Sequence, residues 1–141
     1  MAWKKFSNKW KASSRKNKQS KYRSNAPAHI KHKMMSAHLA KELRKKYGRR
    51  SFPLRKGDTV KIMKGLFSGK TGKVLEMDFG RMKVYIDGMQ IKKQDGSKVN
   101  VPLEPSNLMI TEMNLEDKKR IKAIERKNKS SVPEAKTGGK K

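Results

Sequence analysis

The stretch RKGDTVKIMKGLFSGKTGKVLEMD, residues 55–78, decides the fold, because it describes two short strands joined by a loop of glycine and lysine. From residue 58 to residue 64, apolar and polar side chains alternate, with Val60 and Ile62 on the apolar side. This is the period-2 pattern of a half-buried strand. Three glycines then interrupt the pattern, and a second strand is predicted over 73–78. The stretch therefore predicts a β-hairpin.

The loop of this hairpin carries Lys64, Lys70 and Lys73 around Phe67. Cations beside exposed glycine backbone favour contact with RNA phosphates. The alternative is an ordinary hairpin whose lysines only keep a sheet edge soluble. Phe67 has two open interpretations: it packs back onto the protein, or it stacks on an RNA base.

Downstream of the hairpin, the same alternation predicts strands over 81–86, 89–93, 98–101 and 107–111. The pairs Asp87-Gly88 and Asp95-Gly96 predict type I′ hairpin turns. Short antiparallel strands with glycine turns favour a small barrel over a flat sheet. We expect a mainly β protein.

Helices are predicted on both sides of the barrel. Apolar side chains recur every fourth position from Met35 to Tyr47, Ser36 can cap the start, and Gly48 can end the helix. A C-terminal helix is predicted from Asn114, because acids in its first turn precede a run of cations. The predicted segments are a basic extended arm (1–33), a helix beside the barrel (34–50), the barrel (51–113), a C-terminal helix (114–127) and a basic tail (128–141).

Charge is concentrated at the two ends of the chain. The net charge of the 141 residues is +26, and only 33% of them are hydrophobic. Residues 1–50 hold 17 cations and one acid (+16), residues 51–115 hold 11 and seven (+4), and residues 116–141 hold 10 and four (+6). Such a chain needs a polyanion partner, and nucleic acid is the obvious one.

The N-terminal arm lacks apolar periodicity beyond its first ten residues, so we expect it to be disordered until it binds RNA. Within those ten, Trp3, Phe6 and Trp10 lie at positions i, i+3 and i+7 among lysines. This amphipathic pattern also fits a membrane surface or a partner groove. The charge of the rest of the chain favours insertion of these aromatics between RNA helices.

Residues 55–78 resemble the KOW motif of ribosomal proteins and transcription elongation factors. Two further blocks, NAPAHIKHKMMSAHLAKELRKKYGRRSFPLRKGD (25–58) and DGSKVNVPLEPSNLMITEMNLEDKKR (95–120), resemble the archaeal and eukaryotic branch of the twenty-fourth large-subunit ribosomal protein family, whose eukaryotic counterpart is the twenty-sixth. The likeness covers roughly residues 21–127 and leaves out the first twenty.

The resemblance implies a five-stranded SH3-like (KOW) barrel with a flanking N-terminal helix, a C-terminal helix and basic extended tails. It also implies a structural constituent of the large ribosomal subunit in the cytoplasm. Its implied partners are neighbouring ribosomal proteins and the large-subunit rRNA near its 5′ end. An early role in assembly and a position near the polypeptide exit tunnel are implied as well.

The residues expected to contact RNA lie on the arm, the helices and the loop. They are Arg15, Lys16, Lys18, Lys21, Tyr22, Arg23, His29, Lys31, His32, Lys33, Arg44, Arg49, Arg50, Arg55, Lys64, Phe67, Ser68, Lys70, Lys73, Arg81, Lys119 and Arg120.

Other classes of function lack the residues they need. The absence of cysteine excludes disulfides, thiolate catalysis and zinc–cysteine sites. The histidines His29, His32 and His38 lack companion ligands, and no convergent acid–base or nucleophile set occurs, so we expect no metal, no cofactor, no small-molecule substrate and no enzyme activity. No secretory signal and no run of about 20 apolar residues occurs, so a soluble intracellular protein is expected.

The main alternative function is a KOW-type transcription elongation factor that binds RNA and RNA polymerase. Proteins of that kind usually add an acidic or ferredoxin-like domain, whereas this chain adds basic arms. A general nucleic-acid or chromatin binder on the same barrel is a second alternative.

Overall fold

The computed structural model describes the backbone of residues 6–130 and the side chains of residues 6–126. Its elements in chain order are η1 (Asn8–Ala12), α1 (Lys16–Asn25), α2 (Ala28–Met34), β1 (Ser36–Leu39), α3 (Lys41–Tyr47), β2 (Ser51–Pro53), β3 (Thr59–Ile62), β4 (Thr71–Asp78), β5 (Lys83–Ile86), β6 (Gln90–Lys92), β7 (Lys98–Asn100), η2 (Pro105–Asn107), β8 (Leu108–Glu112) and α4 (Lys118–Ser130).

Six strands form one bent sheet in the order β2-β1-β8-β3-β4-β5, and β6 pairs with β7 alone. All neighbours are antiparallel except β1 and β8, which run parallel with His38 beside Met109 and Leu39 beside Ile110. The predicted strands after residue 55 are all present. Strands β1 and β2 were not predicted.

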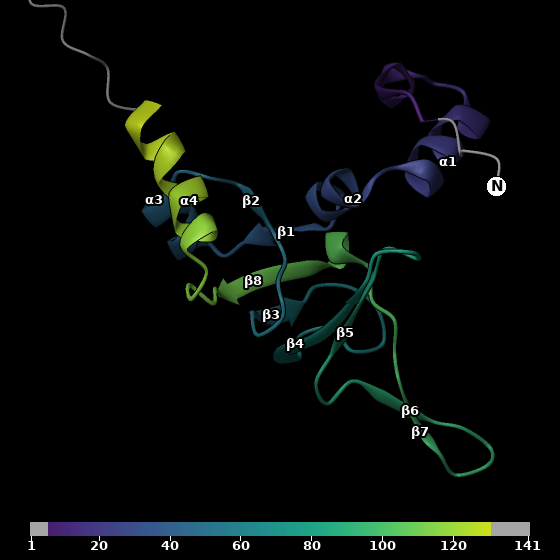
Figure 1. The fold of residues 1–141 in the computed structure, drawn as a ribbon. Coiled ribbons are helices and arrows are strands. Elements are labelled where there is room, and N and C mark those ends of the chain that lie inside the picture. The colour runs from purple at the N-terminus through teal and green to yellow at the C-terminus, as the bar shows by residue number, and fades with distance from the viewer. Residues whose placement is uncertain (1–5, 131–141) are drawn as a thin grey trace, which may run out of the picture.

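The bent sheet approaches a closed barrel because the free edge of β5 is also paired. Val84 donates its N–H to the carbonyl of Leu103 at 2.8 Å and accepts from the N–H of Leu103 at 2.9 Å. Leu103 lies shortly before β8, so the chain returns along β5 before it enters the centre of the sheet (Figure 1). The predicted class, a mainly β protein with a small barrel and flanking helices, is confirmed.

The core is formed by the inward faces that alternation predicted. Val60, Ile62, Val84, Leu108 and Ile110 each have 0% of their surface exposed. Successive strand residues point to opposite faces, so one such face from each strand fills the barrel.

Glycine is required where β4 approaches β5 most closely. A Cβ atom on Gly72 would lie 2.7 Å from both the carbonyl oxygen of Asp87 and Cγ2 of Ile86. No side chain fits there without moving backbone. Gly72 therefore lets β4 reach the end of β5.

The predicted helix from Ser36 is wrong in its first turn, because Ser36–Leu39 is strand β1. Met35, Ala37 and Leu39 are buried at every second position, and a spacing of four fits a period of two as well as it fits a helix. Residues 36–39 form a strand because they pair with β2 on one side and β8 on the other. The helix that follows, α3, ends as predicted at Gly48, which has a φ of 58°.

The C-terminal helix begins later than predicted. Before Lys118 the chain forms local turns, in which Asn114 Oδ1 accepts from the N–H of Glu116 at 3.0 Å. Asp117 Oδ1 then accepts from the N–H of Lys119 at 2.8 Å, which caps the helix. Ile124 is buried against the core, while Leu115 and Ile121 remain exposed.

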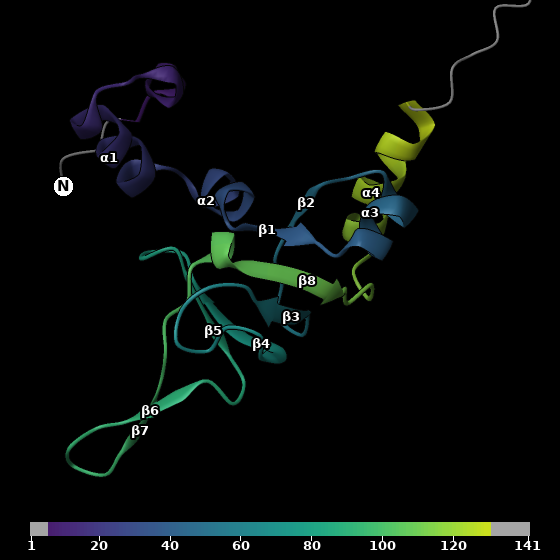
Figure 2. The same cartoon turned by 180° about the vertical axis from the view of Figure 1, so that it is seen from behind.

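The β6–β7 hairpin extends away from the rest of the protein in both views (Figures 1 and 2). Its turn and the turn after β5 have positive φ at Gly96 (86°) and Gly88 (74°), but not at Asp95 or Asp87. The predicted type I′ turns are therefore wrong, since that type needs positive φ at both central positions. In place of it, Asp95 Oδ1 accepts from the N–H of Ser97 at 2.9 Å and from its hydroxyl at 2.6 Å.

The N-terminal segment differs from the predicted extended arm. Residues 16–25 and 28–34 are helical, and α2 leads directly into β1. Phe6 and Tyr22 stack with ring centroids 5.3 Å apart, which folds η1 back toward α1. Trp3 lies outside the described residues.

Candidate nucleic-acid interface

Helix α1 carries exposed cations and no acid in its first turn. Arg15, just before the helix, and Lys16, Lys18, Lys21 and Arg23 within it are all exposed. Such a helix suits the phosphates of a nucleic acid better than the interior of a protein.

Tyr22 is the exception on α1, because it is buried in the free protein, and its contact with RNA stays a prediction. Its side chain is 7% exposed and stacks on Phe6. Tyr22 therefore holds the N-terminal segment to α1 and presents little surface to a partner.

A broad groove of about 1090 Å³ lies between α1 and the barrel. Lys16 and Arg23 line it from α1, Arg81 lines it from the turn before β5, and Lys83 lines it from the start of β5. Glu104 neutralises Lys83, whose Nζ lies 2.9 Å from Oε1 of the acid. The hydrogen bond from Lys83 and its charge hold the pKa of Glu104 below its usual value. The groove thus brings together cations that lie far apart in the sequence.

The loop between β3 and β4 is held by its own backbone. Gly69 donates to the carbonyl of Ile62 at 2.8 Å, and Ser68 donates to the carbonyl of Gly65 at 3.0 Å. Gly65 and Gly69 have φ of 98° and 87°, a region that side chains rarely adopt. Lys64, Ser68 and Lys70 are exposed on this loop, and Lys73 is exposed on β4.

Phe67 packs inward, which is the first of its two open interpretations, and its contact with RNA stays a prediction. It is 9% exposed and belongs to the hydrophobic core. Lys70 Nζ lies 5.3 Å from the centroid of its ring. The apolar side chain exposed at the loop is its neighbour Leu66, at 82%.

Arg120 was also predicted to contact RNA, and it is buried at 3% exposure. Its Nη1 and Nη2 donate to Asp58 Oδ1 at 2.6 Å and Oδ2 at 2.7 Å, in a bidentate ion pair. Asp58 also accepts from the N–H groups of Arg55 and Asn114, each at 2.9 Å. The pair joins the start of the barrel to α4, which is a structural role.

The remaining predicted residues have mixed surroundings. His29, Lys33, Arg44, Arg50 and Lys119 are exposed, and Lys31 is half-buried. In addition, Nε of Arg44 donates to the carbonyl of Leu39 at 2.6 Å. Arg49 is half-buried: its Nη2 donates to the carbonyl of Ala123 at 2.5 Å, and its guanidinium lies over the ring of Phe52. Arg49 therefore attaches α4 to the rest of the protein, and its positive charge is only partly accessible to a partner.

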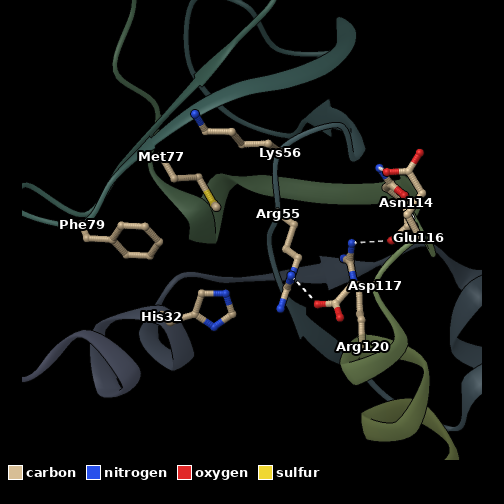
Figure 3. A pocket seen from close by; sticks show the side chains of 9 residues that line it. All are labelled: His32, Arg55, Lys56, Met77, Phe79, Asn114, Glu116, Asp117 and Arg120. Carbon is tan, nitrogen blue, oxygen red and sulfur yellow. Dashed lines mark hydrogen bonds and ion pairs between the residues drawn. The ribbon is translucent and has the colours of Figure 1, made fainter.

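A second cavity, of about 490 Å³, lies where α2, the end of β4 and the segment before α4 meet (Figure 3). Of the predicted residues, His32, Arg55 and Arg120 line it. Burial first, and then the charges of Arg55 and Arg120, lower the pKa of His32. Phe79 also lines this cavity. The sequence does not single it out, because a lone phenylalanine after a strand does not indicate a binding site.

Neither a metal site nor a membrane span is found in the described part of the chain. No three side chains of the types that ligate metals lie close enough together there to hold an ion. Among residues 6–130, no helix has the length and apolar character needed to cross a bilayer.

The chain is similar to known proteins over most of its length. A family model described as the eukaryotic ribosomal proteins L26 and their archaeal L24 counterparts matches residues 13–127. The large ribosomal subunit protein uL24 of Methanosphaera stadtmanae is 47% identical over 110 residues, which cover 78% of this chain and 94% of that protein. The family match includes α1, the groove, the barrel and most of α4, and it begins before the predicted limit at residue 21.

Proposed function

Because the chain belongs to the family of eukaryotic L26 and archaeal L24 ribosomal proteins, we propose that it is a structural constituent of the large ribosomal subunit that binds rRNA directly. The membership confirms the resemblance found in the sequence. The protein acts as a basic clamp, with α1 and the barrel on either side of an RNA strand or helix edge, and it supports assembly of the subunit near the polypeptide exit tunnel.

The observation that carries RNA binding is the groove between α1 and the barrel. Lys16 and Arg23 face Arg81 across it. Three cations that line one groove, two from α1 and one from the turn between β4 and β5, neutralise adjacent phosphates and fix the position of the protein on the RNA. Phosphate contact and shape dominate, since few aromatic side chains of residues 6–126 are exposed for base recognition.

Co-sedimentation tests the place of the protein in the cell. We expect a tagged copy expressed in the source organism to travel with the large ribosomal subunit through a sucrose gradient. Depletion should reduce large subunits relative to small ones. Migration with RNA polymerase instead would support the elongation-factor alternative, for which the family match gives no support.

A charge-matched pair of variants tests the groove. Replacing Lys16, Arg23 and Arg81 together by glutamine should weaken binding to large-subunit rRNA fragments. Replacing Lys92, Lys93 and Lys98 of the projecting hairpin removes the same charge and should have a smaller effect. Equal losses would show that only net charge matters, and the groove would then have no special role.

A further inference from the structure

The cavity beside α2 has the size and lining of a ligand site. Its volume of about 490 Å³ lies within the roughly 300–1,000 Å³ typical of small-molecule sites. It opens between two chemically different walls, one aromatic and one charged (Figure 3).

The aromatic wall is formed by His32 and Phe79. Their ring centroids lie 6.0 Å apart with an interplanar angle of 27°, and Met77 lies on the same side of the cavity. Both rings are half-buried, so part of each remains open to a ligand. With its lowered pKa, His32 stays neutral at pH 7 and adds a flat ring without adding charge.

The charged wall presents donors and acceptors side by side. Arg55 and Asp117 form an ion pair, with side chains 41% and 26% exposed. Asn114 donates its amide to Glu116 at 3.1 Å. Arg120 lies behind them and is occupied by Asp58. Lys56 is exposed and lines the same cavity.

This combination fits a nucleotide better than an ion or a charged peptide. A simple anion would leave the aromatic wall unused, and a cationic side chain would face Arg55 and Lys56. An unpaired base, in contrast, stacks on an aromatic ring and forms hydrogen bonds through its edge, which is the usual mode of specific RNA recognition. The phosphate of the same nucleotide would suit Lys56.

Building on the proposed function, we infer that this cavity holds one unpaired nucleotide of the bound rRNA, with its base on Phe79 and its edge toward the Arg55–Asp117 pair. The cavity then provides a base contact in a protein whose other contacts are to phosphates. It would fix which RNA site the basic clamp occupies.

Two substitutions at residue 79 separate stacking from simple packing. Phe79→Leu keeps an apolar side chain but removes the ring, whereas Phe79→Trp keeps a ring. For fragments of the source organism's large-subunit rRNA, we expect Phe79→Leu to weaken binding by roughly 5- to 160-fold, the range found for loss of one stacked base. Phe79→Trp should bind nearly as the wild type. Neither should change the salt dependence, because no charge is removed.

Chemical probing of the RNA identifies the nucleotide. The wild-type protein should protect one unpaired base from dimethyl sulfate or a carbodiimide reagent, and Phe79→Leu should lose that protection while the rest of the footprint persists. Should Phe79→Leu melt without cooperativity, Met77→Phe provides the second test: it puts a bulkier, stiffer side chain beside Phe79, narrows that side of the cavity, and should cause the same loss of protection.

The outcomes distinguish the two proposals. A wild-type protein that binds no rRNA fragment would overturn the proposed function. Wild-type binding with an unchanged footprint and affinity for Phe79→Leu and Met77→Phe would overturn the cavity alone. Saturable binding of free nucleoside monophosphates as tight as that of RNA, seen as quenching of Phe79→Trp fluorescence, would reassign the cavity to free nucleotides.

Discussion

Phe67 and Leu66 are neighbours on one loop and have opposite environments, which makes them a matched pair for mutagenesis. Phe67 is 9% exposed and Leu66 is 82% exposed. We expect Phe67→Ala to destabilise the protein by about 3 kcal/mol, near the low end for a buried phenylalanine. Leu66→Ala should change stability by less than about 0.5 kcal/mol. Chemical unfolding measures both, and equal effects would mean that Phe67 is not packed in the core.

Removing one partner of the Asp58–Arg120 ion pair should lower the free energy of unfolding substantially. Arg120→Met leaves a buried carboxylate without its main partner, which typically costs roughly 3–5 kcal/mol. The control is Lys83→Met in the Lys83–Glu104 pair, where the partners are 31% and 57% exposed. Exposed pairs contribute about 0–1 kcal/mol. A comparable loss in both variants would contradict the structural role of Arg120.

His32 should make stability depend on pH in a defined window. Its pKa in the folded protein is lowered from 6.5 by burial and by the charges of Arg55 and Arg120. As the pH falls below 6.5, the unfolded chain takes up a proton before the folded chain does, so the free energy of unfolding decreases. The loss is complete only below the folded pKa. In His32→Gln, the stability measured between about pH 7 and about pH 5.5 should decrease less steeply, and an identical slope would contradict the lowered pKa.

Helix α1 has little support from its own sequence. It has no side-chain cap, no acid in its first turn, and Tyr22 as its only buried residue. Ten residues without a cap are marginal as an isolated helix. We expect amide hydrogens of α1 to exchange rapidly in the free protein and slowly when rRNA is bound. Strands β3, β4 and β8 should be protected in both states, and strong protection of α1 in the free protein would contradict this expectation.

The elements also show what the sequence could and could not reveal. Strands β3, β4, β5 and β8 were predictable because alternation is local and one face of each is buried. Strand β1 was not, since a spacing of four residues is common to a helix and a strand, and the partner that decides, β8, lies far along the chain.

The residues of the candidate nucleic-acid interface also fall into those that the sequence predicts and those that it does not. Exposed cations of α1 and of the loop between β3 and β4 follow from composition. Tyr22 is buried by Phe6, Phe67 by the core, and Arg120 by its pairing with Asp58. These are tertiary contacts, and no local sequence pattern predicts them.

For the whole molecule, the net charge of +26 should make RNA binding strongly dependent on salt. Replacing Lys64, Lys70 and Lys73 by alanine removes three cations from one side of the barrel. We expect the slope of log affinity against log salt to decrease by roughly 2–3, and binding to all RNAs to weaken similarly. Phe67→Ala should leave the slope unchanged. Unaltered affinity of the triple variant would remove this loop from the interface.

The parallel pairing of β1 with β8 ties the completion of this fold to a late stage of its synthesis. His38 and Met109 are neighbours in the sheet, yet they are 71 positions apart in the chain. At about 5–20 residues per second, strand β1 waits several seconds for its partner to be made. Strand β2 can pair with one side of β1 during that time, but the side that faces β8 stays an unpaired edge, the kind of surface on which nascent chains associate. The +16 charge of the first 50 residues is already in place then, and its self-repulsion keeps neighbouring nascent copies apart.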